Sequence, residues 1–195
     1  MNNCILGLDL SSVTCGWAIT EKKDDQISII DCGYFRINEK NIYNNAKKSI
    51  KNINSIIQHN SGISKIVIEE PSKKFASGKS TINTIIRLVS INSIVSYSLN
   101  EKFSIEHLSA VRSRKLSCGT TFMSKKERQI EYENIKKQYW RKHHIFEKIV
   151  KLYPEFKKFI KFKINKKTGE DELDPYMYDV CDAIVLSIAG HYNNE

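Results

Sequence analysis

The sequence lacks paired cysteines. Its five cysteines, Cys4, Cys15, Cys32, Cys118 and Cys181, are odd in number and include no Cys-x-x-Cys spacing. A disulfide framework and a structural zinc site both require such pairing, so both are disfavoured. We therefore expect reduced thiols, most of them buried in the core.

Long hydrophobic runs are also missing near the N-terminus. The first apolar run, from Cys4 to Leu8, stops at Asp9 and has no cationic stretch before it. It is too short for a membrane span and lacks the charged start of a signal peptide. We expect a soluble, intracellular and cytoplasmic protein with no membrane partner.

The composition is that of an ordinary globular protein. The 195 residues are 41% hydrophobic and 27% charged, which disfavours intrinsic disorder and fibrous architectures. A chain of this length buries enough surface to hold a core without a metal or a disulfide. Because there is no internal repeat and no long linker, we expect one domain over residues 1–195.

Acidic charge is scarce in one part of the chain. The sequence has 31 basic and 22 acidic residues, a net charge of +9. From Arg112 to Lys167 there are 18 basic and 5 acidic residues, whereas the remainder is slightly acidic. Basic charge gathered in one stretch is typical of a protein that binds a polyanion, although a solvated helix face gives the same pattern.

The order of apolar patterns predicts an α/β fold. Three strands joined by two turns form an antiparallel meander, and helices and strands alternate after it. The predicted strands are 4–10, 16–20, 26–37, 65–70 and 103–108, and the predicted helices are 44–58, 81–99, about 124–152 within the basic segment 112–167, and one opened by Asp174 and Pro175 and running to His191. The helix 81–99 has a wider apolar surface than packing on one sheet requires, which suggests a dimer contact.

Four acidic residues stand at the ends of these apolar segments. Asp9 and Glu69 each end a strand, and Asp179 and Asp182 begin the last helix. A step of three residues turns a helix by about 300°, so the last two project from one side. Carboxylates that are brought together repel one another unless a divalent cation lies between them, and Mg²⁺ prefers oxygen ligands.

Each acid also has an ordinary structural interpretation. An aspartate at a strand end is often a turn former, and one near a helix N-terminus is often a cap. Glu70 competes with Glu69, because side chains of neighbouring strand residues point to opposite faces. Only the joint pattern of the four acids favours a metal site.

The segments ILGLDLSSVTCGWAI, KIVIEEP and YDVCDAIVLSIAG resemble the three acidic motifs of the RuvC-like Holliday junction resolvases, and the resemblance spans nearly the whole chain. It implies a ribonuclease H-like fold with a mixed five-stranded sheet flanked by helices. It also implies a homodimer that nicks branched DNA and leaves 5′-phosphate ends, using two Mg²⁺ ions, or Mn²⁺ in their place. The ligands by position are Asp9, Glu69, Asp179 and Asp182. The sequence Asp9-Leu10-Ser11 departs from the usual Asp-Pro-Gly, which suggests a divergent, virus- or phage-type branch.

The same resemblance suggests residues that contact DNA. Lys115, in a stretch similar to one of the phage relatives, and Lys142 are candidates for the scissile phosphate. Phe75 resembles an aromatic residue that lies at the junction centre. The further predicted contacts are Lys73, Lys74, Lys79, Arg112, Arg114, Lys125, Lys126 and Arg141.

Other functions remain open at this stage. A ribonuclease H-type enzyme that acts on RNA/DNA hybrids or structured RNA would use the same acids. A basic DNA-binding protein without catalysis would not need them. The segment GLDLSS also resembles the first phosphate loop of actin-like sugar kinases and chaperone ATPases, but a second Gly-rich phosphate loop is missing.

Overall fold

A five-stranded sheet forms the centre of the computed structural model, which describes residues 3–37, 39–71, 82–119, 139–165 and 169–193. The strand order is β3-β2-β1-β4-β5; β1 to β3 are antiparallel, and β4 and β5 run parallel to β1. The bounds are β1 (Cys4–Leu10), β2 (Thr14–Lys23), β3 (Gln26–Arg36), β4 (Ile63–Glu69) and β5 (Ser104–Leu108). The predicted mixed sheet and its meander are confirmed.

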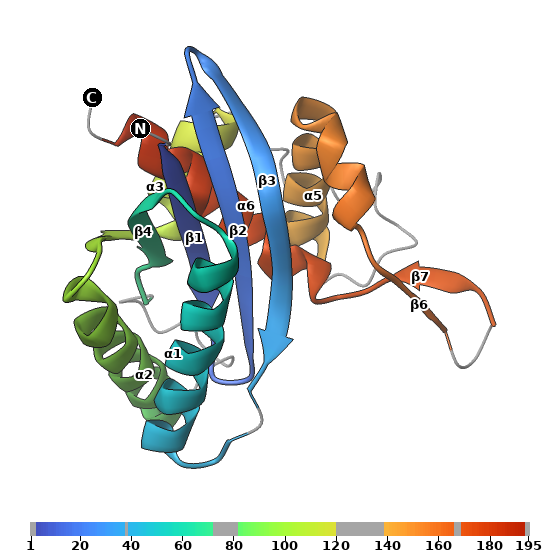
Figure 1. The fold of residues 1–195 in the computed structure, drawn as a ribbon. Helices are drawn as coiled ribbons and strands as arrows, with labels where there is room; N and C mark the ends of the chain where they lie inside the picture. The colour runs from blue at the N-terminus through green and yellow to red at the C-terminus, as the bar shows by residue number, and fades with distance from the viewer. Residues whose placement is uncertain (1–2, 38, 72–81, 120–138, 166–168, 194–195) are drawn as a thin grey trace.

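Helices cover both faces of this sheet (Figure 1). One face packs against α1 (Ile42–His59) and α2 (Ile82–Asn100). The opposite face packs against α6 (Met177–Tyr192), which lies between the sheet and the helices α3 (Ala110–Cys118) and α5 (Trp140–Leu152). The predicted helices 44–58 and 81–99 agree with α1 and α2 to within about two residues.

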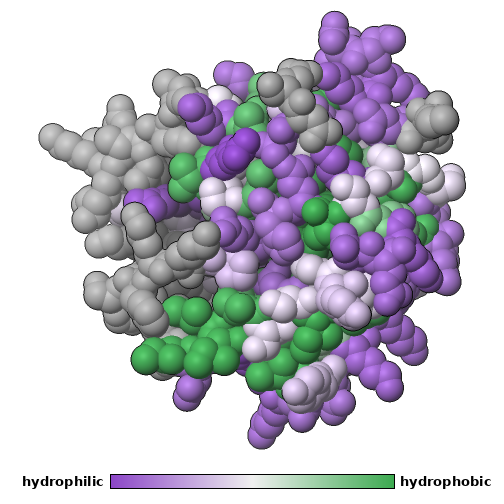
Figure 2. Space-filling model, turned by 90° about the vertical axis from the view of Figure 1, so that its left-hand side faces the viewer, coloured by the Kyte–Doolittle hydropathy of each residue, from purple (hydrophilic) through white to green (hydrophobic). Residues whose placement is uncertain are grey.

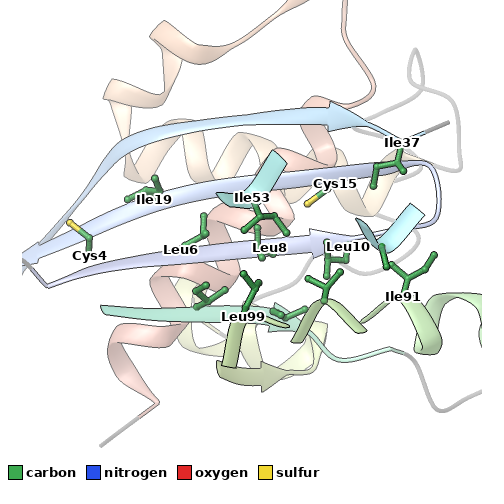
Figure 3. Packing of buried hydrophobic residues seen from close by; sticks show 14 residues of the cluster. Cys4, Leu6, Leu8, Leu10, Cys15, Ile19, Ile37, Ile53, Ile91 and Leu99 are labelled. Carbon is green, nitrogen blue, oxygen red and sulfur yellow. The ribbon is translucent and has the colours of Figure 1, made fainter. Parts of the chain in front are cut away.

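Alternate residues of strand β1 pack on the two faces of the sheet. Leu6, Leu8 and Leu10 pack with α1 and α2 (Figure 3). The residues between them, Gly7 among them, face α6, whose backbone lies directly against Gly7. This alternation follows from the two-residue period of a strand. It determines on which face each acid of the sheet lies.

The second strand is longer than predicted. The strand expected at 16–20 runs from Thr14 to Lys23, and β3 begins at Gln26. Only two residues therefore connect the strands, and Asp24 takes a left-handed conformation with φ of 54°. The charged residues that suggested a turn continue the ladder instead, since Glu21 and Lys23 are paired with Ser28 and Gln26 of β3. Lys23 also forms an ion pair with Glu21 at 2.9 Å.

Several short elements were not predicted. They are α3, the 3-10 helix η2 (Pro154–Phe159) and the hairpin of β6 (Phe162–Ile164) and β7 (Asp171–Leu173). The hairpin strands are too short to show a period, and an ion pair between Lys163 and Glu172 links them. The described part of the predicted helix 124–152 begins only at Trp140, and residues 120–138 lie outside the described structure. The last helix begins at Met177, two residues after Pro175.

All five cysteines are free thiols, and four of them are buried. Helix α2 is long and apolar enough, by length and composition alone, to cross a membrane. However, Ile91, Val95 and Leu99 of this helix are buried against the sheet and α1. Its apolar character is therefore partly explained by the core.

A chain of buried hydrogen bonds ties α6 to β1 and β2. The Ser187 hydroxyl donates to the Ile5 carbonyl at 2.6 Å, so Thr20, 2.7 Å away, donates to Ser187. Thr20 then accepts from Nε2 of His191 at 3.0 Å. The Nδ1 atom of His191 is buried without a hydrogen-bond partner among the described residues. This arrangement requires a neutral imidazole with its proton on Nε2.

His191 should make stability depend on pH. Burial lowers the pKa of His191 to about 4, so between pH 6.5 and 4 the unfolded chain binds a proton that the folded chain does not. Stability therefore falls as the pH falls through this range. Between pH 7.5 and 5 the wild type should lose about 2 kcal/mol more than His191→Gln in urea unfolding. His59→Gln, at an exposed position on α1, is the control, and equal losses in all three proteins would mean that the His191 ring is hydrated.

Candidate active site

Strands β1 and β4 deliver Asp9 and Glu69 to the same face of the sheet. Ile66 and Ile68 of β4 pack with α1 and α2, whereas Val67 packs with α6. Glu69 therefore points to the α6 face, as Asp9 does. By the same alternation, the next residue, Glu70, is on the opposite face. The structure thus brings Glu69 next to Asp9, close enough for the charge of Glu69 to act on Asp9.

Helix α6 delivers the other two acids. Asp179 lies in its first turn, and Asp182 is only 6% exposed. The helix lies very close to the sheet, because a Cβ atom built at Gly16 would lie 2.2 Å from the carbonyl oxygen of Asp179. Gly16 is the register partner of Asp9. The absence of a side chain at Gly16 therefore allows Asp179 to lie beside Asp9.

The four carboxylates affect one another strongly. Burial raises the pKa of Asp9 well above its usual range, and the charges of Glu69, Asp182 and Asp179 raise it further. Burial and Asp182 also raise the pKa of Glu69. Such mutual repulsion in a buried site is relieved when cations enter it.

Two basic side chains already provide part of the positive charge that offsets the four carboxylates. Arg114 of α3 donates to Asp182 at 2.8 Å. Lys142 of α5 donates to Asp179 at 2.7 Å and lies 3.4 Å from Asp182. Burial lowers the pKa of Lys142, but the charges of the acids outweigh burial and raise it above its usual value. Both cations are therefore charged and lie among the four acids.

The other predicted basic residues are distributed differently. Lys115, next to Arg114 in α3, is exposed and takes no part in the ion pairs of the four acids, and Arg112 and Arg141 are exposed as well. Sequence reasoning placed the active-site cation of this segment at Lys115, one residue from Arg114. The remaining predicted contacts lie outside the described residues: Phe75, Lys73, Lys74, Lys79, Lys125 and Lys126.

Aromatic side chains fix α5 on α6. The ring of Tyr139 stacks on Tyr178 with 5.2 Å between centroids. His143 lies 3.0 Å from the Tyr178 hydroxyl and stacks on Phe146. These contacts hold the helix that carries Lys142, which agrees with an anchoring role for Tyr139 and His143.

The donor chemistry of the site fits a hard divalent cation. Four carboxylates suit Mg²⁺, which prefers oxygen ligands. The raised pKa values of Asp9 and Glu69 mean that added positive charge beside them would be stabilised. In the described part of the chain, no three acidic, histidine or cysteine side chains converge on one ion position as they stand. Asp179 and Asp182 instead form ion pairs with Lys142 and Arg114.

Comparison with known proteins identifies the fold. No protein-family model and no curated protein sequence matches the chain. Among solved structures, RuvC of T. thermophilus in complex with a Holliday junction substrate is similar, with a TM-score of 0.64, 6% identity, and 98% and 94% of the two chains covered. The yeast mitochondrial Holliday junction resolvase Ydc2 gives 0.54, 16% identity, and 97% and 81% coverage.

A viral structure is similar as well. The fowlpox virus resolvase, solved with Holliday junction DNA, gives a TM-score of 0.54 at 13% identity, with 98% of both chains covered. The chain therefore has the ribonuclease H-like fold of the RuvC-like resolvases, as the acidic motifs predicted. At these identities the likeness establishes the fold alone.

Proposed function

We propose that the protein is a metal-dependent, structure-selective endonuclease that nicks branched DNA, with four-way junctions as its main substrate. The observation that carries the proposal is the meeting of Asp9, Glu69, Asp179 and Asp182 on one face of the sheet, beside Arg114 and Lys142. Two of the three similar structures are of proteins described as resolvases, and the third is of RuvC in complex with a Holliday junction substrate. Their shared fold supports the same class of substrate here.

The four carboxylates would hold two Mg²⁺ ions, or Mn²⁺ in their place, and Asp9 would share both because it interacts with the other three acids. Two such metal ions would supply an activated water for attack on a phosphodiester and positive charge for the leaving 3′ oxygen, chemistry that would leave 5′-phosphate products. Arg114 and Lys142 are placed to bind the phosphate group and orient it toward the acids. We place this activity in the cytoplasm.

A cleavage assay tests the proposal directly. Labelled four-way junction, linear duplex and RNA/DNA hybrid are incubated with the protein in Mg²⁺ and in EDTA. We expect paired nicks on the junction alone, and none in EDTA. Cleavage confined to the hybrid would transfer the function to the ribonuclease class. Binding without cleavage in any divalent ion would make the acids structural and the protein a DNA-binding protein.

A branched substrate needs two cuts, and we propose that a homodimer makes them. Figure 2 shows apolar side chains gathered on the lower part of the face that includes α1 and α2. On α2, Ile82, Ile86 and Tyr97 are 62%, 56% and 78% exposed. A second copy of the chain would cover this surface.

Disruption of this surface should produce a monomer. We expect the wild type to sediment as a dimer at micromolar concentration and Ile86→Glu to sediment as a monomer, because a buried unpaired charge is costly at an interface. Ile164→Glu, at a 68% exposed position on the β6–β7 hairpin, should leave the dimer intact. A monomeric wild type would contradict the proposed dimer but not the nuclease.

A further inference from the structure

A row of residues leads across the sheet from the acidic centre to its edge. Asp9 of β1 is opposite Gly16 of β2, and Gly16 is opposite Tyr34 of β3. Residues in register point to the same face, so Tyr34 lies on the α6 face at two strand spacings, about 10 Å, from Asp9. At about 3.4 Å per stacked nucleotide, this is the length of about three nucleotides.

A buried carboxylate organises the side chains at the end of this row. Asp174, which is 9% exposed, accepts from the Tyr34 hydroxyl at 2.6 Å and from the backbone N–H of Tyr176 at 3.1 Å. Its own N–H donates to the carbonyl of Lys161 at 3.0 Å. One residue thus joins β3, the chain entering β6, and the start of α6.

Two cations lie against the rings held in this way. The guanidinium of Arg36 lies 5.5 Å from the ring centroid of Tyr176, and the ammonium of Lys161 lies 5.2 Å from that of Tyr34. The two rings are 5.0 Å apart. Both cations are exposed, and neither has an ion-pair partner among the described residues.

We propose that Arg36 and Lys161, supported by Tyr34 and Tyr176, form a phosphate-binding subsite for the DNA strand that leads away from the acidic centre. The inference rests on the proposed function and adds a path for the substrate to it. The rings reduce the mobility of the cations without neutralising them. Because the cations cover ring faces, phosphates and not bases are the expected ligand.

The position of the subsite favours a strand over a free anion. Exposed cations lie on the other side of the acids too, at Arg112 and Lys115 of α3, a helix that packs Leu116 against residues of β4 and β5. A DNA strand that contacted both the Arg36–Lys161 subsite and the exposed cations of α3 would have an intervening phosphate near Arg114 and Lys142. A single small anion would use only one of these positions.

The test compares two charge-matched double variants. The subsite variant combines Arg36→Gln with Lys161→Gln, and the control combines Lys47→Gln with Lys51→Gln, at exposed positions of α1 on the opposite face of the sheet. Binding of labelled junction, duplex and RNA/DNA hybrid is measured by fluorescence anisotropy in EDTA, between 50 and 200 mM salt. Thermal melting verifies that each variant folds.

On the nucleic acid that the wild type binds most tightly, the subsite variant should bind about 10- to 30-fold more weakly, with a log–log salt slope smaller by about 2. The control variant should stay within about twofold of the wild type. Tyr176→Leu, which removes the ring beneath Arg36, should weaken binding by about threefold. If the subsite and control variants have the same slope, the subsite is wrong even where the wild type prefers the junction.

The failure of the proposed function has a different signature. A wild type that prefers the hybrid or the duplex to the junction would contradict the branched substrate. The slope difference between the two double variants would still decide the subsite on that ligand. Absence of binding to all three nucleic acids would overturn both proposals.

Discussion

The Asp9→Asn protein should fold, bind DNA and fail to cut it. Asp9 interacts with the other three acids, and an amide in its place cannot supply the negative charge that the two proposed divalent ions would share. We expect the rate of nicking to fall by at least about 10³-fold, which corresponds to about 4 kcal/mol of transition-state stabilisation. Single-turnover cleavage of a four-way junction measures this loss.

The same substitution should stabilise the fold when no metal is present. The pKa of Asp9 is raised in the folded state, chiefly by burial and then by Glu69. The unfolded chain therefore loses this proton at lower pH, and the group costs stability as the pH rises toward neutrality. In EDTA at pH 7.5, Asp9→Asn should melt about 3–6 °C above the wild type. A variant that is inactive only because it is misfolded would melt lower.

Neighbouring substitutions serve as controls. Asp25→Asn, in the exposed turn after β2, should change neither activity nor melting temperature. Glu69→Gln should lose activity as Asp9→Asn does, whereas Glu70→Gln should remain active, because only Glu69 belongs to the acidic group. If Glu70→Gln lost activity and Glu69→Gln did not, Glu70 and not Glu69 would be the acid of the site. Near wild-type nicking by Asp9→Asn would overturn the mechanism.

The acids were predictable from the sequence because each stands where an apolar pattern ends. The choice between Glu69 and Glu70 was not, since β4 is covered on both faces and reads as a continuous apolar run. Only the packing of Ile66, Val67 and Ile68 shows which face holds α6. The fold class could be predicted all the same, because it depends on the order of the helices and strands and not on which way the side chains of one strand point.

The basic side of the site was less predictable. Helix α3 has no apolar period, so its phase was unknown and Lys115 could not be distinguished from Arg114. The available signal was Ser109, whose side chain caps the helix by accepting from the N–H of Arg112. A helix that begins there and packs Leu116 on the core turns Arg114 toward the acids. Contacts of this kind depend on tertiary structure and not on local pattern.

Gly16→Ala should be severely damaging for so small a substitution. A Cβ atom at this position would lie 2.2 Å from the carbonyl oxygen of Asp179 and 2.9 Å from the backbone nitrogen of Val180. Both are backbone atoms of α6, so relief requires a shift of the whole helix, and α6 is buried along nearly its full length. We expect a loss of at least about 3 kcal/mol, or roughly 6–12 °C in melting temperature.

The matched control is Gly33→Ala on the neighbouring strand. Its Cβ atom would approach only the ring of Trp17, at 3.1 Å, and a side chain yields more easily than a helix backbone. A cost below about 1 kcal/mol is expected there. At temperatures where Gly16→Ala remains folded, its nicking rate should also fall, because Asp179 moves away from Asp9. Wild-type stability and activity in Gly16→Ala would show that α6 does not need its close approach to the sheet to complete the acidic site.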